Sequence, residues 1–193
     1  MAIIVENVRV SYVKVHTPAE NPSGELVYSC CILIPKDDKA NLARVNDAIN
    51  KAKERGLKVW GGKVPKFKYQ PLRDGDAELA SGDREGAEYK GCYFINASMK
   101  AKQGKPGVVD EHARPILNQD KPYSGCYCHV DINPYPYKNS GNTGIGWGLQ
   151  NIMFVEDGDR LDGRRSAQDA FGSLAPGDSD EEHDDADPKE DAF

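Results

Sequence analysis

The sequence predicts a mainly β protein, in which five antiparallel strands form a small barrel, one α-helix lies between the second and third strands, and an acidic tail is disordered. Three observations support this prediction. Five segments are rich in β-branched and aromatic residues, as strands are. One segment repeats apolar residues at helical spacing. After Leu174 the residues are mostly Pro, Gly, Asp, Glu and Ser, a composition that buries too little apolar surface to offset the entropy of ordering.

The first two strands are predicted close to the N-terminus. IIVENVRVSYVKV (3–15) is rich in β-branched residues with partial alternation, which is typical of a long strand. ELVYSCCILI (25–34) is more continuously apolar, which favours a central strand. Between them, HTPAENPSG (16–24) is rich in turn-forming residues and predicts a hairpin loop.

The segment DDKANLARVNDAINKAKERG (37–56) predicts the helix. Asp37 or Asp38 can cap its N-terminus, basic residues cluster near its end, and Gly56 is expected to terminate it. Residues 56–88 look irregular, because Gly, Pro and charged residues recur throughout. The apolar face of the helix comprises Leu42, Val45, Ile49 and Ala52.

Three more strands are predicted in the second half of the chain, at AEYKGCYFINASMKA (87–101), YSGCYCHVDINPYPY (123–137) and GIGWGLQNIMFVED (144–157). In the last strand Gly144, Gly146 and Gly148 alternate, which allows sharp coiling or the close approach of another backbone. RLDGRRSAQDAF (160–171) carries only faint helix signals. The element count fits an OB-like barrel over residues 1–171 with a tail over 172–193, although an open antiparallel sheet with one covering helix fits it too.

Charge is distributed unevenly along the chain. The net charge is −6, but residues 178–193 contain nine acidic residues and one Lys, so residues 1–177 carry a net charge of +2. A mildly basic body with a strongly acidic tail suggests nucleic-acid binding. No apolar run approaches the roughly 20 residues that span a bilayer, and the N-terminus lacks the basic segment of a signal peptide, so a cytoplasmic location is expected.

The five cysteines are expected to be reduced thiols, because their number is odd and no secretion signal precedes them. A zinc site is the alternative. It would use Cys126, Cys128 and His129 together with the adjacent Cys30 and Cys31, but neither spacing is that of a zinc knuckle. Buried thiols are therefore favoured, and no metal or cofactor is predicted.

The stretch RGLKVWGGKVPKFKYQPLR (55–73) is the main candidate for nucleic-acid contact, because it holds six basic residues, no acid and interleaved aromatics. Positive charge follows a phosphate backbone, and aromatic faces stack on unpaired bases. In an extended KFKY segment Phe67 and Tyr69 would share one side. A solvated loop whose aromatics anchor it to the barrel is the alternative. The candidate DNA-binding residues here are Lys58, Trp60, Lys63, Lys66, Phe67, Lys68, Tyr69 and Arg73.

Two later windows add candidates. Residues 89–109 contain no acid, and Lys100 and Lys102 are expected to face outward while Phe94 is expected in the core. The second window, 123–138, is rich in tyrosine, and about half of these rings are expected to stack on bases while the rest pack. The tyrosines are Tyr123, Tyr127, Tyr135 and Tyr137.

Two further patterns point to cations. DGDAELASGDRE (74–85) has acids at positions of a calcium loop, but Leu79 stands where Gly is required. Asp76 and Glu88 could hold Mg²⁺ beside Lys90, as in a metal-dependent nuclease. This short pattern remains the enzymatic alternative to a protein that binds DNA without chemistry.

Several segments occur in an order that resembles a known family. They are QPLRDGD (70–76), YKGCYFINAS (89–98), YSGCY (123–127), GIGWGLQNIMFVEDGDRLDGRRSAQDAF (144–171) and the acidic end. Together they resemble the phage single-stranded DNA-binding proteins, and more narrowly a phage family long catalogued only as a domain of unknown function. The resemblance implies an OB fold, a basic groove lined by aromatics, binding of single-stranded DNA without chemistry, and a role in phage DNA replication and recombination in the host cytoplasm.

The same resemblance gives the tail a function, since several such proteins end in an acidic segment tipped by Phe that docks replication partners (polymerase, helicase or primase) and competes with DNA. A tethered segment of charge −8 stays near a basic groove at high effective concentration. A terminal aromatic offers a partner an apolar anchor. The candidate tail residues are Asp184, Asp185, Asp187, Glu190, Asp191 and Phe193. A solubilising tail, an adaptor that touches no DNA, and a homodimer paired through polar strand edges are also compatible with the sequence.

Overall fold

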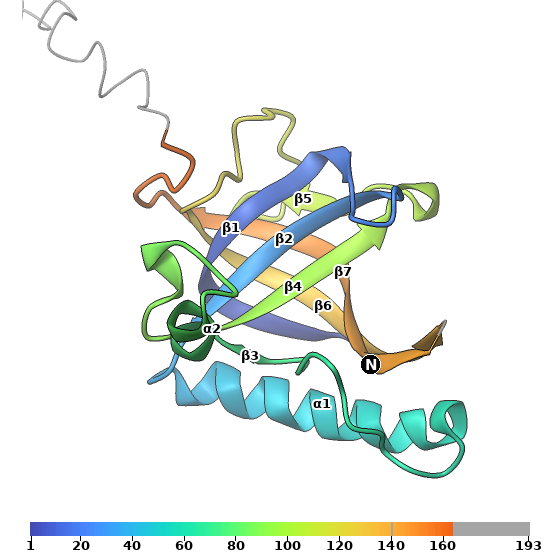
Figure 1. Ribbon diagram of the computed structural model, residues 1–193. Helices are drawn as coiled ribbons and strands as arrows, with labels where there is room; N and C mark the ends of the chain where they lie inside the picture. Colours follow the sequence, from blue (N-terminus) through green and yellow to red (C-terminus); the bar gives the residue numbers. More distant parts are fainter. Residues whose placement is uncertain (140, 164–193) are drawn as a thin grey trace, which may run out of the picture. The chain divides into compact units, whose positions relative to one another are not determined.

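Five long strands close into a barrel in the computed structural model, which describes residues 1–139 and 141–163 (Figure 1). The strands are β1 (Ile3–Glu20), β2 (Leu26–Pro35), β4 (Cys92–Lys100), β6 (Tyr127–Asn139) and β7 (Asn142–Glu156). Their hydrogen-bonding order is β1–β2–β4–β7–β6 and back to β1. This five-stranded closed barrel confirms the predicted OB-like fold. One pair differs from the expectation, because β4 and β7 run parallel.

Two short strands extend the sheet, β3 (Arg73–Asp74) beside β4 and β5 (Gly107–Val109) beside β7. The hairpin between β1 and β2 is tighter than predicted, since β1 continues to Glu20. The remaining turn is held by Asn21, whose Oδ1 accepts hydrogen bonds from the backbone N–H groups of Ser23 and Glu25, both at 3.0 Å. The turn therefore has a fixed backbone at one end of the barrel.

Helix α1 (Lys39–Trp60) lies along one side of the barrel, as Figure 1 shows. Asp38 caps it by accepting a hydrogen bond from the Asn41 N–H, as expected, and its predicted apolar face is buried. The predicted end at Gly56 was wrong by four residues. The helix ends instead before Gly61, which has a left-handed φ of 78°. Gly56 lies inside the helix, at a position that favours glycine because a Cβ there would lie 2.4 Å from the Trp60 ring.

The segment predicted to be irregular contains a second helix, α2 (Gly75–Ser81), so the expectation of a single helix was wrong. Asp74 caps α2 by accepting hydrogen bonds from the N–H groups of Asp76 and Ala77. Two 3₁₀ turns, η1 (Ala87–Tyr89) and η2 (Ala101–Gln103), flank β4. Beside α2 and η1 lies a small apolar cluster outside the main core, made of Cys31, Leu33, Tyr89 and Phe94.

The main core fills the barrel and the space beneath α1. Four of the five cysteines are buried and all five are free, which confirms the expectation of buried thiols, and the Sγ atoms of Cys126 and Cys128 lie 3.6 Å apart. No helix within the described part of the chain is both long and apolar enough to cross a membrane. The faint helix signals after residue 163, the expected domain boundary at 171 and the acidic tail lie outside the described residues.

Candidate nucleic-acid interface

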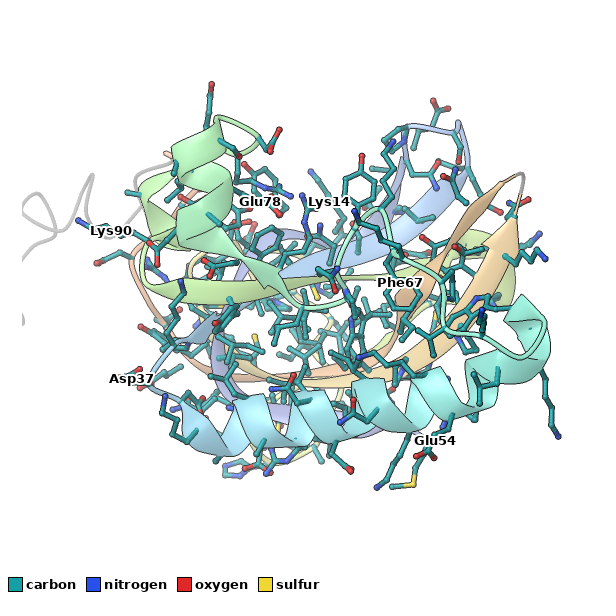
Figure 2. The ribbon with its side chains drawn as sticks, turned by 60° about the horizontal axis from the view of Figure 1, so that its bottom comes forward. Lys14, Asp37, Glu54, Phe67, Glu78 and Lys90 are labelled. Atoms are coloured by element: carbon teal, nitrogen blue, oxygen red, sulfur yellow. The ribbon has the colours of Figure 1, made fainter. Side chains whose placement is uncertain are left out.

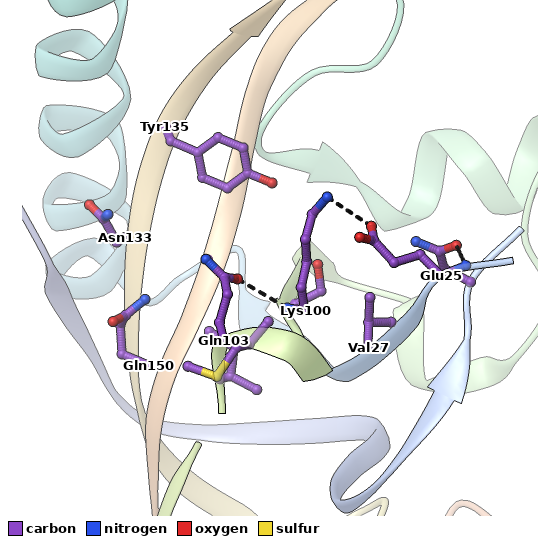
Figure 3. Close-up of a pocket in the computed structure, with 12 residues that line it drawn as sticks. Glu25, Val27, Lys100, Gln103, Asn133, Tyr135 and Gln150 are labelled. Carbon is purple, nitrogen blue, oxygen red and sulfur yellow. Dashed lines mark hydrogen bonds and ion pairs between the residues drawn. The ribbon is translucent and has the colours of Figure 1, made fainter. Parts of the chain in front are cut away.

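A hollow of about 610 Å³ opens on the outside of the barrel, between the β1–β2 turn and the middle of β6 and β7 (Figure 3). The start of β2 and the end of β4 form its floor through Val27, Ser98 and Met99. These strands occupy the second and third places in the barrel, and in OB folds that face and the adjoining loops bind oligonucleotides. The position of the hollow therefore makes it a candidate oligonucleotide-binding site.

Tyr135 and Tyr137 form an aromatic wall beside this hollow. On the outer face of β6, Tyr135 pairs with Gly146 of β7 and Tyr137 pairs with Gly144. A Cβ on Gly146 would lie 2.7 Å from the Tyr135 ring, and one on Gly144 would lie 2.7 Å from the Tyr137 hydroxyl. The alternating glycines therefore allow two rings to lie across the backbone of β7.

The two rings are suited to stacking. Their centroids lie 6.5 Å apart with an interplanar angle of 53°, and Tyr135 is 44% exposed. Burial and the neighbouring Tyr137 raise the pKa of the Tyr135 hydroxyl above its ordinary value, so the ring is neutral at physiological pH. A neutral exposed ring beside cationic side chains is the arrangement that receives an unpaired base next to a phosphate.

A second hollow, of about 280 Å³, continues the surface beyond Tyr137. It is lined by Tyr137, by Lys68 and Tyr69, and by the ends of the β6–β7 hairpin. Tyr69 is 58% exposed, and the cationic groups of Lys68 and Arg73 lie 5.2 Å and 5.4 Å from its ring centroid. The structure thus brings together Tyr69, Tyr135, Tyr137, Lys68 and Arg73, all of which were predicted from the sequence.

Lys100 and Lys102 lie at the other end of this surface, where both face Glu25 of the β1–β2 turn. Lys100 Nζ lies 2.9 Å from Glu25 Oε2 (Figure 3). Lys102 Nζ lies 3.8 Å from Glu25 Oε1. Asn133 and Gln150 add amide groups to the rim of the hollow. We call the surface that runs from Lys100 past Tyr135 and Tyr137 to Tyr69 the tyrosine track.

Trp60 and Phe67 are not part of the tyrosine track, which corrects their predicted role in stacking on bases. They are only 8% and 7% exposed, and their rings meet edge to face with centroids 5.3 Å apart. Trp60 Nε1 donates a hydrogen bond to the Tyr137 carbonyl at 3.0 Å. Figure 2 shows Phe67 among the side chains between loop and barrel. These two aromatics anchor the basic loop to the barrel, as the alternative interpretation of that segment predicted.

Tyr123 and Tyr127 line neither hollow. The Tyr123 hydroxyl donates to Asp157 and to the Gly158 carbonyl, both at 2.9 Å, at a different end of β6. The Tyr127 ring lies against Gly158. The structure gives Tyr123 and Tyr127 packing contacts there. The exposed Lys58, Lys63 and Lys66 at the end of α1 and in the following loop also line neither hollow.

Several lining residues were missed from the sequence, among them Glu25, Asn133 and Gln150. The two amides share the strand parity of the tyrosines and the glycines, so the alternation along β6 and β7 could have found them. Glu25 could not be found by searching for positive charge.

In the nuclease alternative, the Asp76 carboxylate already has structural contacts. Asp76 accepts a hydrogen bond from the Gly91 N–H at 2.9 Å and pairs with Lys36 at 2.9 Å, and both contacts lower its pKa. Across residues 1–139 and 141–163, no group of three or more His, Cys, Asp and Glu side chains could hold a metal ion. In the zinc alternative, His129 Nδ1 instead accepts from the Asn7 N–H at 2.9 Å.

Comparison with known proteins places the chain in a family. The model of the family described as "Enterobacter phage Enc34, ssDNA-binding protein" matches residues 1–186. A curated relative, putative protein p50 of Acyrthosiphon pisum secondary endosymbiont phage 1, is 30% identical in a match of 174 aligned positions that covers 84% of this chain and 88% of the relative.

Solved structures share the fold. The single-stranded DNA-binding protein from bacteriophage Enc34 in complex with ssDNA has a TM-score of 0.71 and 24% identity, over 83% of this chain and 89% of that chain. The single-stranded DNA-binding protein gp2.5 encoded by bacteriophage T7 has a TM-score of 0.59 and 18% identity, over 92% of this chain and 96% of that chain. Since the family model covers nearly the whole sequence, the chain belongs to the Enc34 ssDNA-binding protein family.

Proposed function

We propose that the protein binds single-stranded DNA along the tyrosine track, with little preference for sequence. The observation that carries the proposal is the pair of tyrosine rings laid over the glycines of β7, with cationic side chains at both ends. Aromatic faces stack on any base, because every base has a π-face. Lysine and arginine neutralise phosphates without reading sequence. Membership of a family described by ssDNA binding supports the same function.

In this proposal each part of the track has one role. Tyr135, Tyr137 and Tyr69 stack on successive bases, while Lys68, Lys100 and Lys102 hold the phosphates on either side. Arg73 supports the Tyr69 ring instead, because both oxygens of the Glu78 carboxylate already accept hydrogen bonds from its guanidinium. The amides of Asn133 and Gln150 hydrogen-bond to base edges or sugars of the bound strand. In this proposal the protein catalyses no reaction. It protects single strands and presents them to other proteins during phage DNA replication and recombination in the host cell.

The acidic tail completes the proposal. Residues 178–193 carry −8 against +2 on the rest of the chain, so the tail competes with DNA for the basic surface when DNA is absent. Phe193 then docks replication proteins of the phage or its host. An adaptor that touches no DNA would lack affinity for oligo-dT with or without this segment.

The test of the proposed function is the anisotropy of a fluorescently labelled oligo-dT titrated with the full-length protein. Tyr135→Ala is expected to weaken binding about 5- to 150-fold, the range that corresponds to the loss of one stacked base. Tyr135→Phe keeps the ring and is expected to bind like the wild type. Equal binding by the wild type and Tyr135→Ala would contradict the stacking role. Tryptophan fluorescence is a poorer readout, because Trp60 and Trp147 are both buried.

A further inference from the structure

We propose that Glu25 is a built-in competitor of DNA: its carboxylate occupies the place of a phosphate between Lys100 and Lys102 and has to be displaced when a strand binds. The inference rests on the proposed function. Within residues 1–139 and 141–163, Glu25 is the one acidic residue whose side chain lines either hollow of the tyrosine track, and it lies between two lysines of the track.

The contacts of Glu25 match those of a bound phosphate. One carboxylate oxygen lies 2.9 Å from Lys100 Nζ and the other lies 3.8 Å from Lys102 Nζ, so a single anion bridges two cations. A DNA phosphate also presents two anionic oxygens to neighbouring lysines. Both anions cannot occupy this place together, because like charges that close repel. Binding of DNA here is thus an exchange of one anion for another.

The carboxylate is not needed to fold the turn that carries it. The backbone of Glu25 is held separately: its N–H donates to Asn21 Oδ1 at 3.0 Å, and its carbonyl accepts from the Asn21 N–H at 2.9 Å. The carboxylate contacts Lys100 and Lys102 instead, at the edge of the hollow that Tyr135 borders. Figure 3 shows the Lys100 ammonium turned towards Glu25 across the space that Tyr135 overlooks. The Glu25 carboxylate therefore belongs to the ligand site and not to the framework of the turn.

The pairing is weak enough to be reversible. The side chains of Glu25 and Lys100 are 35% and 50% exposed, and ion pairs in that position are screened by water and salt. A strand held at several other points of the track can replace the carboxylate, whereas a single inorganic anion lacks those additional contacts. Glu25 thus lowers the affinity for every polyanion by a constant factor and keeps the lysines ordered while the track is empty.

The experiment compares two full-length variants that lose the same unit of charge. Glu25→Gln is expected to bind oligo-dT about 3- to 10-fold more tightly than the wild type at low salt, as the release of two exposed lysines predicts. Glu54→Gln is the matched control, because Glu54 is an exposed residue that projects from α1 away from the barrel (Figure 2). It is expected to stay within about twofold of the wild type, since Glu54 lines neither hollow of the tyrosine track.

A second background, in which both lysines are replaced, tests whether the effect of Glu25→Gln acts through Lys100 and Lys102. In a Lys100→Gln and Lys102→Gln protein, the additional Glu25→Gln substitution is expected to change affinity no more than Glu54→Gln does. Equal binding by Glu25→Gln and Glu54→Gln in the wild-type background would overturn the inference. Weaker binding by Glu25→Gln would overturn it too, and would show that the carboxylate orients Lys100 for DNA. If the wild type itself fails to bind oligo-dT, the proposed function fails, and this result is distinct from the other two.

Discussion

At the scale of single residues, the stacking surface depends on the absence of a side chain. Gly146 and Gly148 both lie on the outer face of β7, but only Gly146 lies directly under a tyrosine ring. A Cβ on Gly146 would lie 2.7 Å from the Tyr135 ring, whereas a Cβ on Gly148 would have its nearest neighbours at 3.4 Å and 3.6 Å, which is tight but close to ordinary contact. The two glycines are therefore a matched pair for testing the tyrosine track.

We expect Gly146→Ala to push the Tyr135 ring off β7 and to weaken oligo-dT binding about 3- to 30-fold, part of the energy of one stacked base. Gly148→Ala is expected to leave affinity within about twofold, because no ring has to move. Anisotropy titrations of both variants, with thermal unfolding to compare their stability, test this. Equal affinities of the two variants would mean that the ring's position over Gly146 does not matter for binding.

At the scale of elements, helix α1 shows how an aromatic can override a helix-ending signal. Gly56 was expected to end the helix, since Gly favours the position just after a helix. In the structure the helix continues because Trp60 packs back over Gly56, one turn earlier, and donates its N–H to the Tyr137 carbonyl. The pattern of apolar residues predicted the buried face of α1 correctly, but its end depends on a tertiary contact.

Gly56→Ala is therefore expected to destabilise the protein by about 1–2 kcal/mol, despite the better helix propensity of Ala, because the added methyl overpacks the Trp60 ring. Asn50→Ala, at an exposed position of the same helix, is expected to be neutral or slightly stabilising. Urea unfolding followed by circular dichroism measures both. A stabilising Gly56→Ala would show that the ring moves aside without loss.

The loop after β5 gives a prediction about pH. Asp110 accepts hydrogen bonds from the backbone N–H groups of Arg114 and His112 and from the Arg114 side chain, and these contacts lower its pKa from 3.8 to about 2. A lowered pKa in the folded state means that ionised Asp110 stabilises the loop above about pH 4. That contribution is lost as the pH falls through about 2.

A carboxyl ¹³C NMR titration of the full-length protein checks this value. Arg114→Gln keeps the backbone donors, so it is expected to raise the pKa of Asp110 only part of the way towards 3.8. A wild-type Asp110 that already titrates near 3.8 would show that the loop does not hold these hydrogen bonds in solution.

At the scale of the whole molecule, the fold was easier to predict than the site. In each long strand and in the main helix, apolar residues recur about every two or 3.6 positions, and this repeat is visible in the sequence. The tyrosine track shows such a pattern only along β6 and β7, since Glu25 and Lys100 meet Tyr135 only after the barrel closes. Phe67 and Tyr69 illustrate the limit: they are two residues apart, yet one is buried and the other is exposed, because their segment follows an irregular path instead of a strand.

The charge of the whole chain leads to a final prediction. Removal of residues 178–193 changes the net charge from −6 to +2 and removes the proposed competitor of DNA. A chain that ends at Gly177 is expected to bind oligo-dT about 3- to 10-fold more tightly than the full chain at low salt, because the tethered tail no longer competes for the basic surface. The advantage should shrink at 1 M salt, where the Debye length is only about 3 Å.

The full-length Phe193→Ala protein separates the two proposed functions of the tail. It keeps all nine acids of the segment, so its affinity for oligo-dT is expected to match that of the full-length wild type, while any docking of replication proteins through the Phe193 ring is lost. Anisotropy titrations of the wild type, the chain ending at Gly177 and Phe193→Ala at low and high salt test whether the tail competes with DNA. If the shortened chain binds no more tightly at low salt, the tail does not compete with DNA, and its charge serves only solubility or partner binding.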